Sequence, residues 1–172
     1  MTLVVREARP EDDAAIGEVL VSGYLAAYRK KMPHVVVSEA RRADLRDLAG
    51  RRGFATILVA ELDGRVVGSV ALLKPGVPRS EAWIPGAADL RYLATDPSVQ
   101  GRGLAGPLLD EIERIARDEW RVPAVCLHVR QGNLGVARLY QSRGYVRAPE
   151  GDLIKPEVSL EAWALDWGHP AH

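Results

Sequence analysis

The centre of this 172-residue chain constrains its fold most, because two predicted strands there flank a glycine-rich turn and a helix. Asp89–Thr95 has the residue types of a strand, and Asp96-Pro97 ends it. A helix is expected to open near Gly103, with a buried stripe at Leu104, Leu108, Ile112 and Ile115. Val122–Val129 is the second predicted strand. Because a strand–helix–strand crossover places its two strands parallel in one sheet, this pair should be parallel.

The segments before and after this crossover predict an antiparallel remainder of the sheet. Phe54–Glu61 and Arg65–Lys74 flank an Asp63-Gly64 turn, which is the strongest hairpin signal in the chain. Further strands are expected at Leu3–Arg9, Tyr145–Arg147 and Val158–Trp167. Three further helices are expected: one from Pro10 to about Lys31, one that Ser38 caps and that Gly50 and Gly53 close, and a short one from Asn133 to Gly144. We therefore expect residues 1–172 to form a single α/β domain, with a mixed, mostly antiparallel sheet of about six or seven strands and about four helices.

The composition argues against several classes of function. Lys plus Arg and Asp plus Glu both number 23, so the formal net charge is zero and a nucleic-acid partner held by bulk charge is not expected. Cys126 is the one cysteine, which rules out an intrachain disulfide and argues against a cysteine-based zinc site, and no metal is implied. No apolar run approaches the roughly 18 residues of a membrane span, and the acidic N-terminal stretch does not resemble a signal peptide. We expect a soluble cytoplasmic protein with no membrane partner.

The turn Gln100–Gly106 has the chemistry of a phosphate-binding loop. Glycines let the backbone approach a ligand closely, and the unpaired N–H groups of a helix N-terminus attract phosphate. Pro107 fits the first helical turn, because it loses no helical hydrogen bond there. The three glycines also match G-x-G-x-x-G, the fingerprint of nicotinamide dinucleotide sites. That interpretation is not favoured, because Asp96–Gln100 separate the strand from Gly101 and the next strand ends without an acid.

Two motifs in order along the chain resemble those of the GCN5-related N-acetyltransferase (GNAT) superfamily. The first is Q-x-x-G-x-A at Gln100, Gly103 and Ala105, preceded by a strand end that reads Leu93-Ala94-Thr95-Asp96-Pro97. The second runs from Asn133 through Ala137 and Tyr140 to Gly144 and Tyr145. The resemblance covers about Asp89–Tyr145, and the opening Val5–Asp12 is also typical of the family. It implies a domain that takes an acetyl group from acetyl-CoA and transfers it directly to a primary amine.

The resemblance also implies which residues contact acetyl-CoA. Backbone groups of Leu93, Ala94 and Thr95 would pair with the pantetheine arm like an added strand, and one N–H would face the thioester oxygen. The pyrophosphate would lie on Gln100, Gly101, Arg102, Gly103, Leu104, Ala105 and Gly106. Asn133 would contact the arm, cap its own helix, or do both.

By the same resemblance, Tyr140 would be the general acid. A phenol is protonated at neutral pH and can give a proton to a leaving thiolate, although a core tyrosine is the alternative. His128 lies five residues before Asn133, where some members of the family place a glutamate base, and an imidazole can take up a proton near neutral pH. A core role for His128 is one alternative, and Asp89 is another candidate base or a group that orients the amine. Cys126 is interpreted as a packed residue, since direct attack by the amine needs no nucleophilic thiol.

The family builds its acceptor pocket from the segment that joins the first two helices and from the loop near the last two strands. Tyr28, His34 and Trp83 are the expected lining residues, and Glu150 and Asp152 are further candidates whose charge would suit a cationic amine. A solvated loop is the alternative for each of them. The expected partner is a small-molecule or peptide amine.

Two further interpretations stay open at this point. Exposed sheet edges and the face with Trp163 and Trp167 are compatible with a homodimer. The alternative function is a catalytically silent acyl-CoA sensor or an interaction module, and Tyr140 is the residue that argues for turnover.

Overall fold

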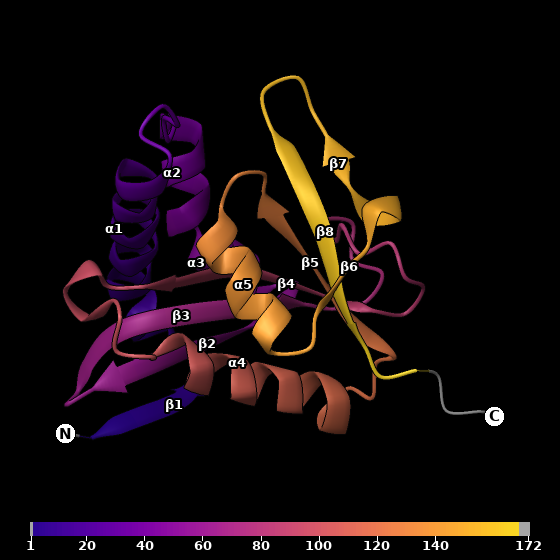
Figure 1. Ribbon diagram of the computed structural model, residues 1–172. Coiled ribbons are helices and arrows are strands. Elements are labelled where there is room, and N and C mark those ends of the chain that lie inside the picture. The colour runs from indigo at the N-terminus through magenta and orange to yellow at the C-terminus, as the bar shows by residue number, and fades with distance from the viewer. Residues whose placement is uncertain (1, 169–172) are drawn as a thin grey trace. The chain divides into compact units, whose positions relative to one another are not determined.

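The computed structural model describes residues 2–168, in which the chain divides into two compact units. The first unit holds the described residues up to Leu72 together with Tyr92–Arg114, and the second holds Leu73–Arg91 together with the described residues from Ile115 onward. The strands, labelled in Figure 1, are β1 (Leu3–Glu7), β2 (Ala55–Leu62), β3 (Arg65–Leu73), β4 (Ala88–Thr95), β5 (Ala124–Arg130), β6 (Val146–Arg147), β7 (Leu153–Ile154) and β8 (Ser159–Asp166). Their hydrogen-bonded order is β1-β2-β3-β4-β5-β8-β6, and β7 pairs with β8.

The expected mixed and mostly antiparallel α/β fold is confirmed. β1 pairs with β2, and β6, β7 and β5 pair with β8, all antiparallel. β4 and β5 are parallel, with Ala88 opposite Val125 and Asp89 opposite Cys126, as the crossover predicts. The strand β7 was not expected, because a segment of two residues is too short to carry an alternating pattern. The prediction that residues 1–172 form a single domain stays a prediction.

The first unit contains the hairpin of β2 and β3. Asp63 and Gly64 form its turn with φ of +51° and +82°, the left-handed backbone of a tight hairpin connection. β1 adds to the other edge of β2, with Leu3 opposite Leu62 and Glu7 opposite Leu58. The hairpin predicted from the Asp-Gly turn is therefore confirmed, and the first three strands of the sheet follow from it.

Of the five α-helices in residues 2–168, four belong to the first unit: α1 (Asp13–Lys31), α2 (Glu39–Arg46), α3 (Leu48–Arg52) and α4 (Ala105–Arg114). Ser38 caps α2 as expected, because its hydroxyl oxygen accepts a hydrogen bond from the Arg41 N–H at 3.1 Å. The expectation of one helix up to Gly50 is wrong, since Asp47 breaks it. The Asp47 carboxylate accepts a hydrogen bond from the Gly50 N–H at 3.0 Å and so caps the start of α3.

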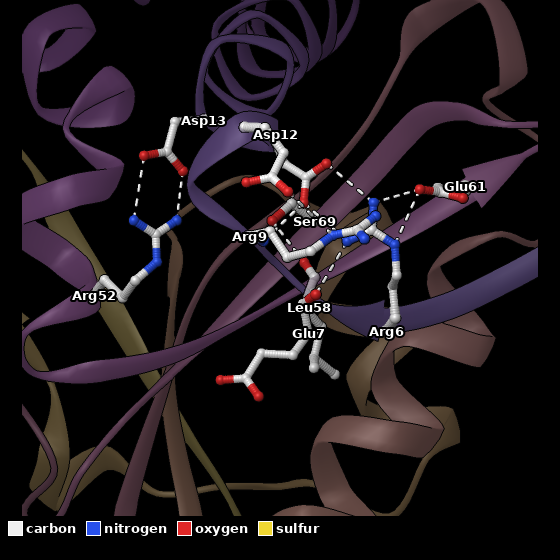
Figure 2. Close-up of polar contacts among 10 residues, drawn as sticks. Arg6, Glu7, Arg9, Asp12, Asp13, Arg52, Leu58, Glu61 and Ser69 are labelled. Carbon is white, nitrogen blue, oxygen red and sulfur yellow. Dashed lines mark hydrogen bonds and ion pairs between the residues drawn. The ribbon is translucent and has the colours of Figure 1, made fainter.

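An ion-pair network joins β1, the first helical turn and β2 in this unit. Figure 2 shows the Arg6 guanidinium between the carboxylates of Asp12 and Glu61. Arg6 donates to both oxygens of Asp12, at 2.8 and 3.0 Å, and its Nε donates to Glu61 at 3.0 Å. Arg52 pairs with Asp13 beside it, which links α3 to the start of α1. These contacts hold the N-terminal strand against the hairpin.

The second unit is built around β8. β5 runs antiparallel to it from Ala124 opposite Asp166 to Arg130 opposite Leu160, which places His128 opposite Ala162. The helix α5 (Leu134–Ser142) follows β5, and Gly144 ends it with a φ of +96°. A 3-10 turn, Pro149–Gly151, separates β6 from β7. In the described part of the chain, no helix is both long and apolar enough to cross a membrane.

Candidate active site

The glycine-rich turn follows β4 in the first unit and leads into α4. Asp96 starts it by accepting hydrogen bonds from the Ser98 N–H at 2.9 Å and hydroxyl at 2.6 Å, and these bonds lower the pKa of Asp96. Gly101 and Gly103 have φ of +84° and +72°, a backbone that side chains rarely adopt. At both glycines, no atom of the described chain comes within 4 Å of the position that a Cβ would occupy. The backbone conformation therefore requires glycine, and it leaves open space beside the turn.

The last residues of β4 lie tightly against α1 in the same unit. A Cβ on Gly23 would come within 2.9 Å of the Thr95 carbonyl oxygen and 3.1 Å of the Ala94 Cβ. A glycine inside a helix is costly, so this close approach explains its presence. The Gln100 side chain lies near the same strand end, with its Nε2 3.5 Å from the Thr95 carbonyl oxygen. Leu93, Ala94 and Thr95 are thus held in place next to the glycine-rich turn.

Asn133 stands at the N-cap position of α5 but does not cap it with its side chain. The helix has no side-chain cap hydrogen bond, so the capping alternative is wrong. The Asn133 Oδ1 is buried and has no hydrogen-bond partner among the described residues. Because a buried acceptor without a partner is costly, this atom is suited to a donor that a ligand brings.

Tyr140 lies on α5 and is 4% exposed. Its ring meets that of Tyr145 edge-on, with 5.2 Å between ring centroids. Tyr145 is more deeply enclosed, at 1% exposure. Both tyrosines belong to the second unit, and the pair fixes the orientation of the Tyr140 ring.

Asp89 is almost completely enclosed, at 1% exposure, on β4 in the second unit. Its Oδ2 accepts a hydrogen bond from the Glu81 N–H at 2.9 Å and forms an ion pair with the Arg91 Nε at 2.9 Å. Its Oδ1 is buried and has no hydrogen-bond partner in the described chain. Burial raises the pKa of Asp89, and the nearby Arg91 and His128 oppose that rise. Asp89 therefore lies in the electrostatic environment of His128, but its oxygens are shielded from solvent.

His128 is held by a backbone carbonyl from a distant part of the sequence. Its Nε2 lies 2.8 Å from the carbonyl oxygen of Gly151. The Trp83 ring meets the imidazole edge-on, with 5.3 Å between ring centroids. Trp83 was expected to line the acceptor pocket, and the structure places it against His128 and Gly151. No sequence pattern pointed to Gly151, because a carbonyl acceptor has no residue signature.

Cys126 is fully buried beside His128 on β5, where it packs with Ala87 and Ala124. Burial raises the pKa of its thiol. A protonated and enclosed thiol suits a packed residue rather than a nucleophile.

The other expected acceptor residues are spread over the chain. Tyr28 belongs to the first unit, on α1, where its ring is 6.1 Å from that of Tyr24. His34 is exposed in the segment between α1 and α2. Glu150 is exposed, whereas Asp152 is paired with Arg147 at 2.6 Å, which lowers the pKa of that carboxyl. The Asp152 charge is therefore already balanced by an arginine.

A cluster around Tyr92 was missed by sequence reasoning. Tyr92 has a φ of +60°, a conformation that costs a bulky residue roughly 1–3 kcal/mol. Its hydroxyl donates to the Asp44 carboxylate at 2.9 Å, and the Arg51 guanidinium stacks 3.7 Å from its ring centre. These contacts offset the strain directly before Leu93. A single residue in a left-handed conformation leaves no periodic signal that could have predicted it.

Each unit, taken by itself, holds groups with a definite chemistry. The first unit has an open glycine turn before a helix, which suits phosphate. The second unit has an imidazole with one ring nitrogen hydrogen-bonded to a carbonyl, and a buried phenol. Within the described residues, no group of three or more His, Cys, Asp or Glu side chains is placed to hold a metal ion.

Comparison with known proteins identifies relatives of the chain. The model of the Acetyltransferase (GNAT) family matches residues 17–145. The chain is 30% identical over 103 residues to the S-(2-succino)cysteine N-acetyltransferase of Bacillus subtilis, covering 59% of this chain and 61% of that protein. It is 37% identical over 109 residues to the mycothiol acetyltransferase of Brachybacterium faecium, covering 60% of this chain and 30% of that protein. The chain thus matches less than two thirds of the length of either relative.

Solved structures share the fold. An acetyltransferase from Corynebacterium glutamicum, described as related to a histone acetyltransferase, superposes with a TM-score of 0.72 at 21% identity over the full length of both chains. The PaiA N-acetyltransferase of Thermoplasma acidophilum, solved in complex with coenzyme A, superposes with a TM-score of 0.71 at 17% identity, over 94% of this chain and 98% of that one.

Proposed function

The chain belongs to the Acetyltransferase (GNAT) family, and from this premise we propose that it transfers an acetyl group from acetyl-CoA to a primary amine. The amine attacks directly while both substrates are bound. The Bacillus subtilis relative is named as an N-acetyltransferase, which supports nitrogen as the acceptor atom. Acetyl-CoA, when bound, supplies an acetyl group that is activated as a thioester.

The observation that carries this proposal is the open glycine turn. Gly101 and Gly103 adopt left-handed backbone, and side chains at either position would enter the space beside the turn. The turn leads into α4. The first N–H groups of a helix have no carbonyl partner within it, so they can donate to an anion. We assign the pyrophosphate to Gln100–Gly106 on these grounds. Arg102 is exposed within the turn and adds a positive charge.

The pantetheine arm is assigned to two further features. Leu93, Ala94 and Thr95 are at the opposite end of β4 from the residues that pair with β5, and they offer strand backbone to an extended ligand. The Asn133 Oδ1 offers a buried acceptor to which none of the described residues donates. The amide groups of the arm have the donors that this atom needs.

We propose His128 as the group that takes the proton from the acceptor ammonium. Its ring is partly exposed, whereas Asp89 is 1% exposed and both of its oxygens are enclosed. A general base must come within hydrogen-bond distance of the proton that it removes, and Asp89 is too deeply buried for that contact. Asp89 is the second candidate, and the nearby His128 opposes the rise that burial causes in its pKa.

Tyr140 is proposed as the group that returns a proton to the departing thiolate. A neutral phenol can donate a proton to a thiolate, which then leaves as a thiol. The edge-on contact with Tyr145 holds the ring in one orientation, as a proton donor requires. Tyr28 and His34 are proposed to face the acceptor amine, which is a small molecule or a peptide end.

The first test is calorimetric titration of the purified protein with acetyl-CoA and, separately, with NADPH. Binding of acetyl-CoA without binding of NADPH supports the assignment of the glycine turn, and absence of acetyl-CoA binding refutes the proposal. An amine library is then screened for release of free thiol. Binding with no release on any amine would favour the silent acyl-CoA sensor instead.

The role of Tyr140 is tested by Tyr140→Phe, with Tyr145→Phe as the matched control. The first substitution should slow transfer roughly 10- to 1000-fold and leave the affinity for acetyl-CoA similar. The control removes the hydroxyl of the neighbouring tyrosine in the same ring pair and reports the effect of losing a buried hydroxyl there. Equal rates in the two variants would refute the general-acid assignment.

A further inference from the structure

The environment of His128 specifies which of its ring nitrogens is free for chemistry. A carbonyl oxygen only accepts hydrogen bonds, so the 2.8 Å contact with Gly151 requires the hydrogen to be on Nε2. In the neutral ring the lone pair is then on Nδ1. Among the described residues, Nδ1 has no hydrogen-bond partner.

We propose that Gly151 and Trp83 are positioning residues that lock His128 in the Nε2–H form, so that Nδ1 is the atom that takes the proton. This inference rests on the proposed function of His128 as base. The acceptor ammonium gives its proton to Nδ1, and the ring becomes an imidazolium. The Nε2–H bond to the carbonyl is unchanged in that step.

The turn that carries Gly151 is bonded on both sides to the residue directly opposite His128. Ala162 lies across from His128 in the pairing of β5 with β8. Its carbonyl oxygen accepts from the Ala148 N–H at 2.9 Å, and its own N–H donates to the Asp152 carboxylate at 2.8 Å. The residues on both sides of Gly151 are therefore hydrogen-bonded to Ala162. These bonds anchor the turn on β8 opposite His128.

Trp83 makes glycine necessary at position 151. A Cβ on Gly151 would overlap the indole ring of Trp83. The same ring packs edge-on against the imidazole and covers the buried Gly151. This packing keeps water from competing for the carbonyl, because the acceptor is enclosed on that side. The φ of Gly151 is one that other residues also adopt, so the close approach of Trp83 is the reason for a glycine at this position.

The test is the tautomer of His128 itself, measured by long-range ¹H–¹⁵N NMR of the imidazole nitrogens at a pH where the ring is neutral. The chain has four histidines, and a spectrum of His128→Gln identifies the signals that belong to His128. We expect the Nε2 signal at the shift of a protonated nitrogen and the Nδ1 signal at that of an unprotonated one. A wild-type ring with its hydrogen on Nδ1 would overturn the inference.

Gly151→Ala is the variant, and Gly53→Ala is its matched control. In the variant, displacement of Trp83 should weaken the carbonyl contact and move both nitrogen signals toward a mixture of tautomers. Gly53 has an ordinary φ of −67° in the first unit, and its substitution should leave the signals unchanged. Unchanged signals in a folded Gly151→Ala protein would refute the role of Gly151. If that variant does not fold, Trp83→Phe replaces it, since a smaller ring should produce the same change.

These measurements separate the inference from the proposed function. The tautomer is read without any substrate, so it can be correct even if acetyl-CoA does not bind. Conversely, acetyl-CoA binding together with an Nδ1–H ring would preserve the proposed function and refute the locking of His128.

Discussion

Replacing Asp12 with asparagine should lower the free energy of unfolding at pH 7 by about 2 kcal/mol. The pKa of Asp12 is lowered from its ordinary 3.8 to about 2. The hydrogen bonds from the Arg6 guanidinium are the largest cause, and the Arg9 N–H adds to them, whereas burial raises the pKa. Because one pKa unit corresponds to about 1.4 kcal/mol, the carboxylate form stabilises the fold by about 2 kcal/mol. Asp12 is 8% exposed, so solvent screens this interaction little.

The pH dependence follows from the direction of that change. A lowered pKa in the folded state means that the stabilisation is present above pH 4 and is lost as the pH falls toward 2. The difference between the wild type and Asp12→Asn should therefore shrink to about half by pH 3. Urea denaturation at a series of pH values between 7 and 3 measures both quantities.

Asp13→Asn is the matched control. Asp13 is the next residue, lies at the start of α1 and also pairs with an arginine, Arg52. The Asp13 and Arg52 side chains are 26% and 31% exposed, so their pair should contribute less than about 1 kcal/mol. Both variants lose a similar interaction with the helix dipole, which cancels in the comparison. Equal losses in the two variants, or a loss at Asp12 that does not shrink as the pH falls, would refute the reasoning.

Three further predictions concern the turn, the arm and a helix cap. Gly103→Ala should weaken acetyl-CoA binding roughly 10-fold by calorimetry, because alanine resists a φ of +72°; an unchanged affinity would remove the turn from the site. Asn133→Ala should weaken the same binding roughly 3- to 30-fold and change the unfolding free energy by less than about 1 kcal/mol, since no cap bond is lost. Ser38→Ala should cost about 1 kcal/mol in urea denaturation, because it removes the bond to the Arg41 N–H; a neutral result would mean that α2 does not depend on its cap.

The local signals in the sequence were sufficient for most of the architecture. The Asp63-Gly64 turn specifies its hairpin, because few other residue pairs accept left-handed backbone at both positions. The crossover around the glycine turn specifies the parallel strand pair, because the connecting helix must pack on the sheet. Ser38 specifies the start of α2 through one short-range hydrogen bond. Each of these features depends on residues close together in the chain.

The tertiary structure decided what the candidate site residues do. Asn133 has the residue type and position of a cap, yet its side chain does not cap α5, and only the folded environment shows that its oxygen is left without a donor. The sequence offered His128 as the base with Asp89 as the alternative, and their different burial separates the two residues. The carbonyl oxygen that accepts the orienting hydrogen bond of His128 belongs to Gly151, 23 positions away. A contact of this kind depends on which strands pair and in what register. The sequence by itself therefore determined the elements and the residue types of the candidate site. The packing between distant segments determined the burial and the hydrogen-bond partners of each side chain.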